Sequence, residues 1–140
     1  MSFKLGTVDG KAVLIKGDFY YDISSLSNGS ISSDSVEALK LQSELSALYE
    51  SLNEKNASGK LSDVELGNPV PTSPNCYAVG LNYRKHAEES GMDIPEVPMI
   101  FTKHTSCFVG PKADIEMRSD YVDWEVELVA VIGKDGKNIP

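Results

Sequence analysis

One stretch decides how the fold is interpreted: Asp123-Trp-Glu125-Val-Glu127-Leu-Val-Ala-Val-Ile-Gly133. Its apolar and β-branched residues, ended by Gly133 and a Lys-Asp-Gly turn, predict a buried strand. Because side chains alternate between the two faces of a strand, Glu125 and Glu127 share one face. That face continues as Val129 and Val131. One face of the predicted strand is therefore acidic at its start and apolar at its end.

Two neighbouring carboxylates on a buried strand need a positively charged partner. A buried carboxylate without a partner is costly, and two of them repel each other. A hard divalent cation such as Mg²⁺ or Mn²⁺ suits the oxygen ligands of Glu125 and Glu127. The alternative is an exposed strand edge on which acidic residues only increase solubility and discourage pairing. The apolar continuation favours the metal site, because a solvated face usually keeps alternating polar residues.

Composition narrows the class of protein. The chain has 140 residues with 41% hydrophobic content, which is enough for one core or two small units. Its formal net charge of -8 argues against nucleic-acid or anionic-membrane binding. We see no hydrophobic signal region and no run of membrane-spanning length, so we expect a cytoplasmic protein. Cys76 and Cys107 lack the spacing of a zinc site.

The first part of the chain predicts a β-meander and a helix. Strands are expected at 3–8, 11–16 and 19–23, separated by Asp-Gly and Gly-Asp turns. Asp34 and Glu37 predict a capping box, and apolar residues at helical spacing extend the helix to Asn53. A short extended segment should follow at 61–66. The apolar stripe of this helix indicates a core face that packs against the meander.

Three prolines then separate two units. They lie within the segment Pro69-Val-Pro-Thr-Ser-Pro74, which can continue neither a helix nor a central strand. We therefore predict domains at 1–68 and 69–140. The second begins with a strand at 76–79, and a helix at 83–90 should follow between Asn82 as its cap and Gly91.

That second helix carries a candidate acid–base pair. His86 and Glu89 are three residues apart, so both lie on one side of the helix. A carboxylate beside a histidine orients the ring and makes it more basic, as a general base requires. A plain surface pair has the same spacing, so the spacing alone leaves both interpretations open.

Two basic residues are candidates for binding an anionic substrate. Lys103 ends a predicted strand at 99–103, and Arg118 lies in a polar bend. Solvent-facing lysines are common, which is the alternative for Lys103. Further extended segments are expected at 106–109 and 113–117. After the turn that ends the acidic strand only four residues remain, which indicates a fragment or a strand that a partner covers.

Three pieces in register together resemble the fumarylacetoacetate hydrolase family, in its short-chain branch. They are Tyr77-Ala-Val-Gly-Leu-Asn-Tyr-Arg-Lys-His-Ala-Glu-Glu89, Pro98-Met-Ile-Phe-Thr-Lys103 and Asp123-Trp-Glu-Val-Glu-Leu128. This branch includes acylpyruvases, oxaloacetate decarboxylases and dienedioate isomerases. The resemblance covers 70–140 densely and implies an α+β, mainly β fold. In that fold a small meander-and-helix domain precedes the start of a mixed β-roll, usually in a homodimer.

The resemblance also implies roles for residues. Glu125 and Glu127 match the pair that binds Mg²⁺ or Mn²⁺, and His86 with Glu89 matches a catalytic pair on a helix that folds over the substrate. Lys103 matches a lysine after a phenylalanine strand. The third metal ligand of the family is an aspartate expected beyond residue 140. On this basis we expect the 69–140 domain to be the first part of a longer catalytic domain.

The implied function is a metal-dependent hydrolase, lyase or isomerase. Its substrates are 2-oxo or 1,3-dicarbonyl acids, which react by C–C cleavage, decarboxylation or isomerisation through a metal-stabilised enolate. The alternative is an inactive fragment, or a non-catalytic binding or oligomerising module of the same fold. The expected partners are a small-molecule substrate and a second copy of the chain, with no nucleic acid and no membrane.

Overall fold

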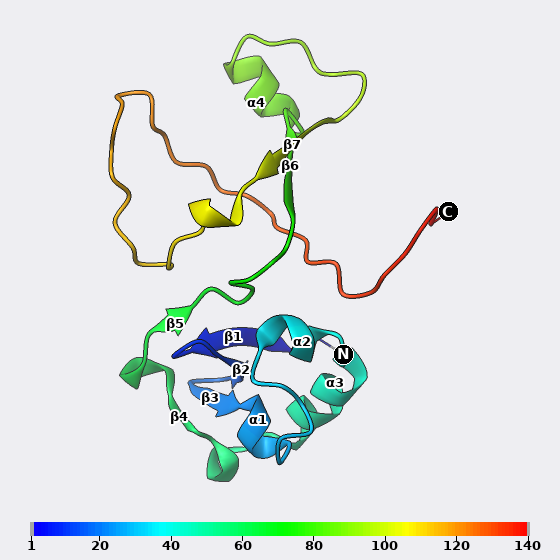
Figure 1. Ribbon diagram of the computed structural model, residues 1–140. Helices are drawn as coiled ribbons and strands as arrows, with labels where there is room; N and C mark the ends of the chain where they lie inside the picture. Colours follow the sequence, from blue (N-terminus) through cyan, green and yellow to red (C-terminus); the bar gives the residue numbers. More distant parts are fainter. Residues whose placement is uncertain (1, 140) are drawn as a thin grey trace. The chain divides into compact units, whose positions relative to one another are not determined.

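The computed structural model describes residues 2–139 of the chain, which divide into two compact units (Figure 1). One unit takes in the chain up to Pro71 and again from Val109, and the other is Thr72–Phe108. The first change of unit falls within the proline-rich connector. The domain boundary at residue 69 remains a prediction, and each unit is considered by itself below.

The first unit is built on an antiparallel sheet with the strand order β4-β3-β2-β1-β5. Its strands are β1 Lys4–Val8, β2 Lys11–Lys16, β3 Phe19–Asp22, β4 Gly59–Lys60 and β5 Leu66–Gly67. The predicted meander is confirmed. Asp9 and Gly10 connect β1 to β2 with φ angles of 49° and 74°, the left-handed values that a tight hairpin turn needs.

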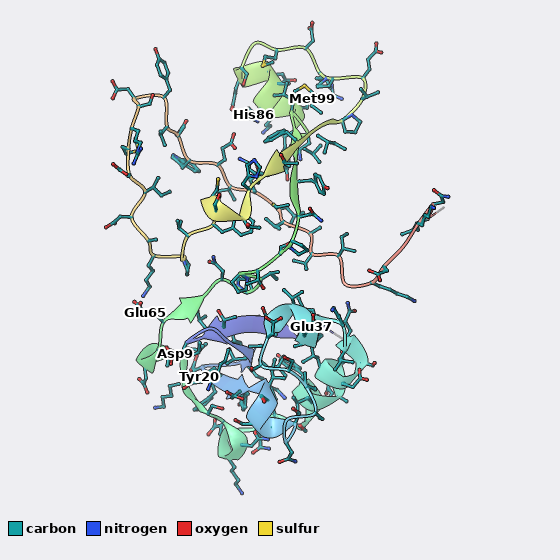
Figure 2. The ribbon with its side chains drawn as sticks, in the orientation of Figure 1. Asp9, Tyr20, Glu37, Glu65, His86 and Met99 are labelled. Atoms are coloured by element: carbon teal, nitrogen blue, oxygen red, sulfur yellow. The ribbon has the colours of Figure 1, made fainter. Side chains whose placement is uncertain are left out.

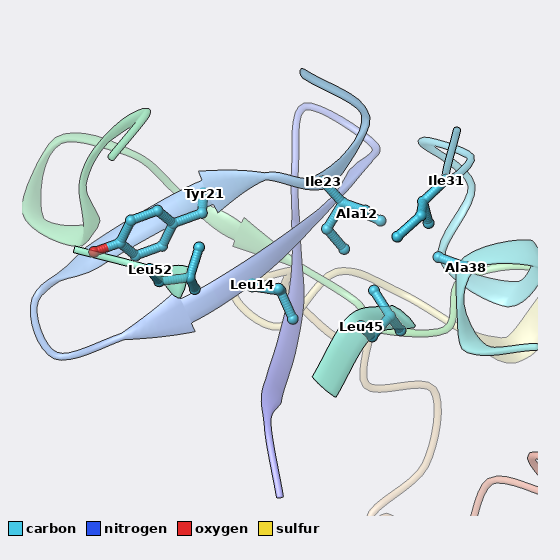
Figure 3. Close-up of a cluster of buried hydrophobic side chains, with 8 residues drawn as sticks. All are labelled: Ala12, Leu14, Tyr21, Ile23, Ile31, Ala38, Leu45 and Leu52. Carbon is cyan, nitrogen blue, oxygen red and sulfur yellow. The ribbon is translucent and has the colours of Figure 1, made fainter. Parts of the chain in front are cut away.

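Three helices cover one face of this sheet and enclose the hydrophobic core (Figure 3). They are α1 Ile23–Leu26, α2 Ser35–Leu39 and α3 Gln42–Ser51, followed by the 3₁₀ turns η1 Glu54–Asn56 and η2 Leu61–Asp63. The core consists of Ala12, Leu14, Tyr21, Ile23, Ile31, Ala38, Leu45 and Leu52. Sheet residues and helix residues both contribute, so the predicted packing of the helical stripe on the meander is confirmed.

The single helix predicted from Ser35 to Asn53 is wrong, because α2 and α3 are separate. The start is as predicted: Asp34 Oδ1 accepts a hydrogen bond from the Glu37 backbone N–H at 2.9 Å. Glu37 does not complete the capping box and instead pairs with Lys40 at 2.7 Å. Leu41 then has φ −107° and ψ 53°, which are not helical. Apolar spacing reports which side chains face the core, and it does not detect one non-helical residue between two helices.

The second unit is an antiparallel hairpin whose strands are connected through a short helix. β6 Cys76–Gly80 pairs with β7 Met99–Lys103, and α4 Arg84–Glu89 lies between them in sequence. The 3₁₀ turn η3 Thr105–Cys107 follows β7. Both strands and the helix are confirmed predictions. The extended segment expected at 106–109 is wrong, because the chain turns through η3 there.

From Val109 to residue 139 the structure contains no helix or strand. The strands predicted at 113–117 and 123–133 are therefore wrong. A strand exists only where a neighbour accepts and donates its backbone hydrogen bonds, and no described segment pairs with these residues. The start of this segment is attached to the first unit, because Asn68 Nδ2 donates to the Val109 carbonyl at 2.9 Å. Thr7 Oγ1 in turn donates to the Asn68 carbonyl at 3.0 Å.

Candidate functional site

Helix α4 carries the predicted acid–base pair. Backbone hydrogen bonds close the end of this helix, whereas its start has no side-chain cap. After the helix, Gly91 has φ 63°, and its N–H bonds the Glu88 carbonyl at 3.2 Å. Met92 N–H bonds the Ala87 carbonyl at 2.9 Å, which completes the motif that commonly ends helices. At the start, the predicted cap by Asn82 is wrong. Tyr83 occupies the cap position and makes no side-chain hydrogen bond to the helix.

His86 and Glu89 are both exposed on α4, and Figure 2 shows His86 on this helix. Ala87 is the buried residue of the helix. Among the residues that the structure describes, the His86 ring and the Glu89 carboxylate form no hydrogen bond or salt bridge. As predicted, the two side chains lie on the same helix. Both are exposed and accessible to a ligand. Their catalytic role remains a prediction.

Lys103 ends β7 opposite Cys76, at the open end of the hairpin. Its Nζ lies 5.5 Å from the centre of the Phe101 ring, a distance at which a cation is attracted to the aromatic face. An open cavity of about 320 Å³ occupies this end of the hairpin and is lined by Pro74, Asn75, Cys76, Tyr77, Thr102, Lys103, His104, Thr105 and Ser106. One cation and several hydroxyl groups suit a small anionic group, such as a carboxylate.

The hairpin separates this cavity from the helix. Gly80, after which the chain leads into α4, pairs with Met99, whereas Cys76 pairs with Lys103. The two pairs lie four residues apart, or about 13 Å along a strand. Lys103 and the start of α4 therefore lie at opposite ends of one small sheet. The second unit by itself does not bring His86 and Lys103 together.

Glu125, Glu127 and Arg118 lie in the part of the chain that follows Val109, and all three side chains are exposed. The expectation of a buried carboxylate pair is therefore wrong, for the same reason that the strand is absent. Arg118 Nη2 pairs with Glu116 Oε2 at 2.7 Å, so a neighbouring carboxylate already balances its charge. Neither Glu125 nor Glu127 forms a salt bridge with any described residue, which leaves both carboxylates open to a cation.

The donor chemistry of these two residues fits a hard divalent ion, although the number of donors is small. Within the described chain, no group of three or more His, Cys, Asp or Glu side chains could hold a metal ion. Hard cations of this size take six or more oxygen ligands, some of them water. Glu125 and Glu127 therefore fit as two ligands of a site that needs further donors.

Sequence reasoning did not single out Leu81. This residue joins β6 to α4 and has a φ of 50°, a value that a leucine rarely adopts. A glycine or asparagine at this position would have indicated a left-handed turn. Leucine gives no such signal, so only the backbone geometry identifies it.

Comparison with known proteins places this arrangement in a class. The family model described as fumarylacetoacetate (FAA) hydrolase C-terminal matches residues 75–140. This range contains all three pieces on which the resemblance rested. The resemblance is confirmed: residues 75–140 match the C-terminal model of the fumarylacetoacetate hydrolase family.

Curated relatives match about half of the chain. A human protein named oxaloacetate tautomerase FAHD2A, mitochondrial, is 42% identical over 80 residues, which are 56% of this chain and 26% of that protein. A fumarylacetoacetate hydrolase domain-containing protein 2 homolog from Dictyostelium discoideum is 49% identical over 73 residues, which are 50% of this chain and 24% of that protein. The chain thus matches about a quarter of the length of these relatives.

A solved structure matches a larger share of the chain. A crystal structure from Mycobacterium smegmatis, provisionally named an HpcE protein, is 31% identical, with a TM-score of 0.61. The match covers 73% of this chain and 36% of that one. The α+β, mainly sheet fold class is confirmed.

No helix in the described part of the chain is long and apolar enough to cross a bilayer. The human relative is named as mitochondrial, and a cytoplasmic location for this chain remains a prediction.

Proposed function

We propose that this chain provides the acid–base helix and two metal ligands of an enzyme of the fumarylacetoacetate hydrolase family. Its substrates would be 2-oxo or 1,3-dicarbonyl carboxylic acids. The observation that carries the proposal is the match of residues 75–140 to the family model, since this range contains His86, Lys103 and both carboxylates. A tautomerase of oxaloacetate, which is a 2-oxo acid, is among the relatives.

The chemistry follows from the side chains. His86 is exposed on α4 and can take a proton from the carbon beside a carbonyl group, or from an attacking water. Glu89 on the same face would stabilise the protonated ring. Lys103 would hold a substrate carboxylate by charge. A Mg²⁺ or Mn²⁺ ion held by Glu125 and Glu127 together with further ligands would supply Lewis-acid stabilisation of the developing enolate.

The metal role is tested by calorimetric titration of the intact protein with Mn²⁺. We expect Glu125→Gln to lose more affinity than the roughly 10–100-fold typical of a residue outside the ligand shell. Glu116→Gln is the matched control, because it removes the same charge from an exposed residue nearby and should bind Mn²⁺ as the wild type does. Equal affinity of Glu125→Gln and wild type would exclude the ligand role.

The base role is tested by turnover of oxaloacetate, acylpyruvates and fumarylacetoacetate-like diketones with Mg²⁺. We expect His86→Ala to lower kcat by about 10²–10⁴-fold, the usual contribution of a general base, with Mn²⁺ affinity unchanged. Lys85→Ala, an exposed neighbour on the same helix, should keep wild-type turnover. If His86→Ala turns over normally, the histidine takes no part in the reaction.

The second candidate is a non-catalytic module of the same fold. The small number of metal donors in the described chain favours it. An intact protein that binds no Mn²⁺ and turns over none of these acids would support this alternative over the enzyme.

A further inference from the structure

The turn before α4 contains a residue in an unusual backbone conformation. Among the described residues, four other than glycine have a positive φ, namely Asp9, Asn28, Leu81 and Asn138. Aspartate and asparagine tolerate the left-handed region because their short polar side chains can bond locally. Leucine has no such compensation. At Leu81, the surrounding structure therefore imposes a conformation that the side chain does not favour.

Helix α4 does little to fix its own starting point. It has six residues, no side-chain cap and no acidic residue in its first turn. Arg84 and Lys85 stand there instead, and positive charge opposes the helix dipole at this end. Ala87 is the only residue of α4 that is buried. Neither capping, charge nor extensive packing therefore sets the direction in which this helix leaves the sheet.

The turn supplies that direction. β6 is held in register with β7 up to the pair Gly80 and Met99, so the path of the chain is fixed up to this point. Leu81 is the next residue, and its φ of 50° redirects the backbone three residues before the helix begins. A change of φ at this position would rotate everything that follows, including the His86 ring.

We propose that Leu81 is a positioning residue, whose left-handed backbone rather than its side chain determines where α4 holds His86. The expected effect of Leu81 on turnover rests on the function proposed for His86. The expected effect of Leu81 on the position of α4 does not depend on that function. Leu81 could act through its backbone conformation or through the apolar contacts of its side chain. These two roles predict opposite orders of damage for the same two substitutions. Asparagine accepts the left-handed conformation but removes apolar contacts, whereas valine keeps an apolar side chain but disfavours that conformation.

Amide hydrogen exchange of the chain measures the helix directly. The reporters are the Ala87 N–H, bonded to the Tyr83 carbonyl at 3.2 Å, and the Ser90 N–H, bonded to the His86 carbonyl at 3.0 Å. We expect both to exchange roughly tenfold faster in Leu81→Val and at the wild-type rate or slower in Leu81→Asn. Protection that is greater in Leu81→Val than in Leu81→Asn would overturn the proposal.

A matched control separates this effect from the general consequence of introducing valine. Leu61→Val makes the same change at a half-buried leucine in the first unit, where φ is not positive. It should leave exchange at Ala87 and Ser90 unchanged. Faster exchange at these amides in the control would show that the turn is not responsible, and would also overturn the proposal.

Turnover of the intact protein gives the second measurement. We expect Leu81→Val to lower kcat on the order of 10²-fold with little change in KM, because a displaced base impairs the step after binding. Leu81→Asn should turn over close to wild type. Wild-type kcat in Leu81→Val would overturn the positioning role. Failure of the proposed function is recognised separately, by normal turnover in His86→Ala with the exchange order of the Leu81 variants preserved.

Discussion

At the scale of single residues, burial changes the chemistry of one titratable group in the core. The Tyr21 side chain is 1% exposed and packs among apolar residues (Figure 3). Burial raises the pKa of Tyr21 above its ordinary value of 10.0, and the negative charge of Glu54 adds to the effect. A buried phenol favours its neutral form because the phenolate would lose its hydration. The folded state therefore holds this proton more tightly than the unfolded chain does.

This difference predicts a loss of stability in alkaline solution. Below the unfolded pKa of about 10, Tyr21 is neutral in both states and its contribution is fully present. As the pH rises through 10 toward the raised folded pKa, only the unfolded state releases the proton, so the free energy of unfolding falls. Urea unfolding at pH 8 and pH 11 measures the fall.

Two variants isolate the residue responsible. Tyr21→Phe should show a smaller fall in stability between these pH values than wild type, because the titrating group is removed. Tyr77→Phe, at a position 63% exposed, should keep the full wild-type fall. An equal pH dependence in Tyr21→Phe and wild type would contradict the assignment.

At the scale of elements, the end of α3 depends on a side chain from the sheet. The last carbonyl groups of a helix lack partners within the helix. Lys16 Nζ donates to the Tyr49 carbonyl at 3.2 Å and to the Leu52 carbonyl at 3.0 Å. It also lies 5.2 Å from the centre of the Tyr49 ring. One half-buried lysine of β2 thus connects the sheet to the C-terminal end of the helix.

Removing this charge should weaken the whole first unit. We expect Lys16→Met, which keeps the apolar stem, to lower the free energy of unfolding by about 1–2 kcal/mol, since two charged hydrogen bonds are lost. Lys11→Met on the same strand changes an exposed lysine and should stay within roughly 0.5 kcal/mol of wild type. Denaturant unfolding of the two variants side by side checks the difference, and equal stability would show that the Lys16 contacts contribute nothing.

The elements also show what local sequence signals can and cannot predict. The Asp-Gly turn, the Asp34 cap and the closure of α4 at Gly91 were predictable, because each rests on backbone conformations that one or two residues favour. The separation of α2 from α3 at Leu41 was not, since leucine is a good helix former and gives no local signal for the non-helical angles found there. Leu81 escaped notice for the same reason.

At the scale of the whole molecule, the packed core and the family match lie in different parts of the chain. Every core residue precedes residue 53, whereas the family model matches 75–140. Apolar side chains in the matched part are largely exposed, including Trp124 at 81% and Leu128 at 87%. The family resemblance was therefore readable from motifs in a part of the chain that contributes nothing to the packed core. The homodimer and the substrate class remain predictions.

The sequence by itself determined the local features of this protein: the meander, the helix start capped by Asp34, the helix that carries His86, and the motifs that resemble the fumarylacetoacetate hydrolase family. These local features depend on interactions between residues a few positions apart in the sequence. Such residues are close together however the rest of the chain folds. Tertiary structure alone decided whether the segment around Glu125 forms a strand and where the helices of the first unit separate. It also decided which turn sets the direction of α4. Those outcomes depend on distant segments that must supply hydrogen bonds and packing, and local residue order does not specify their positions.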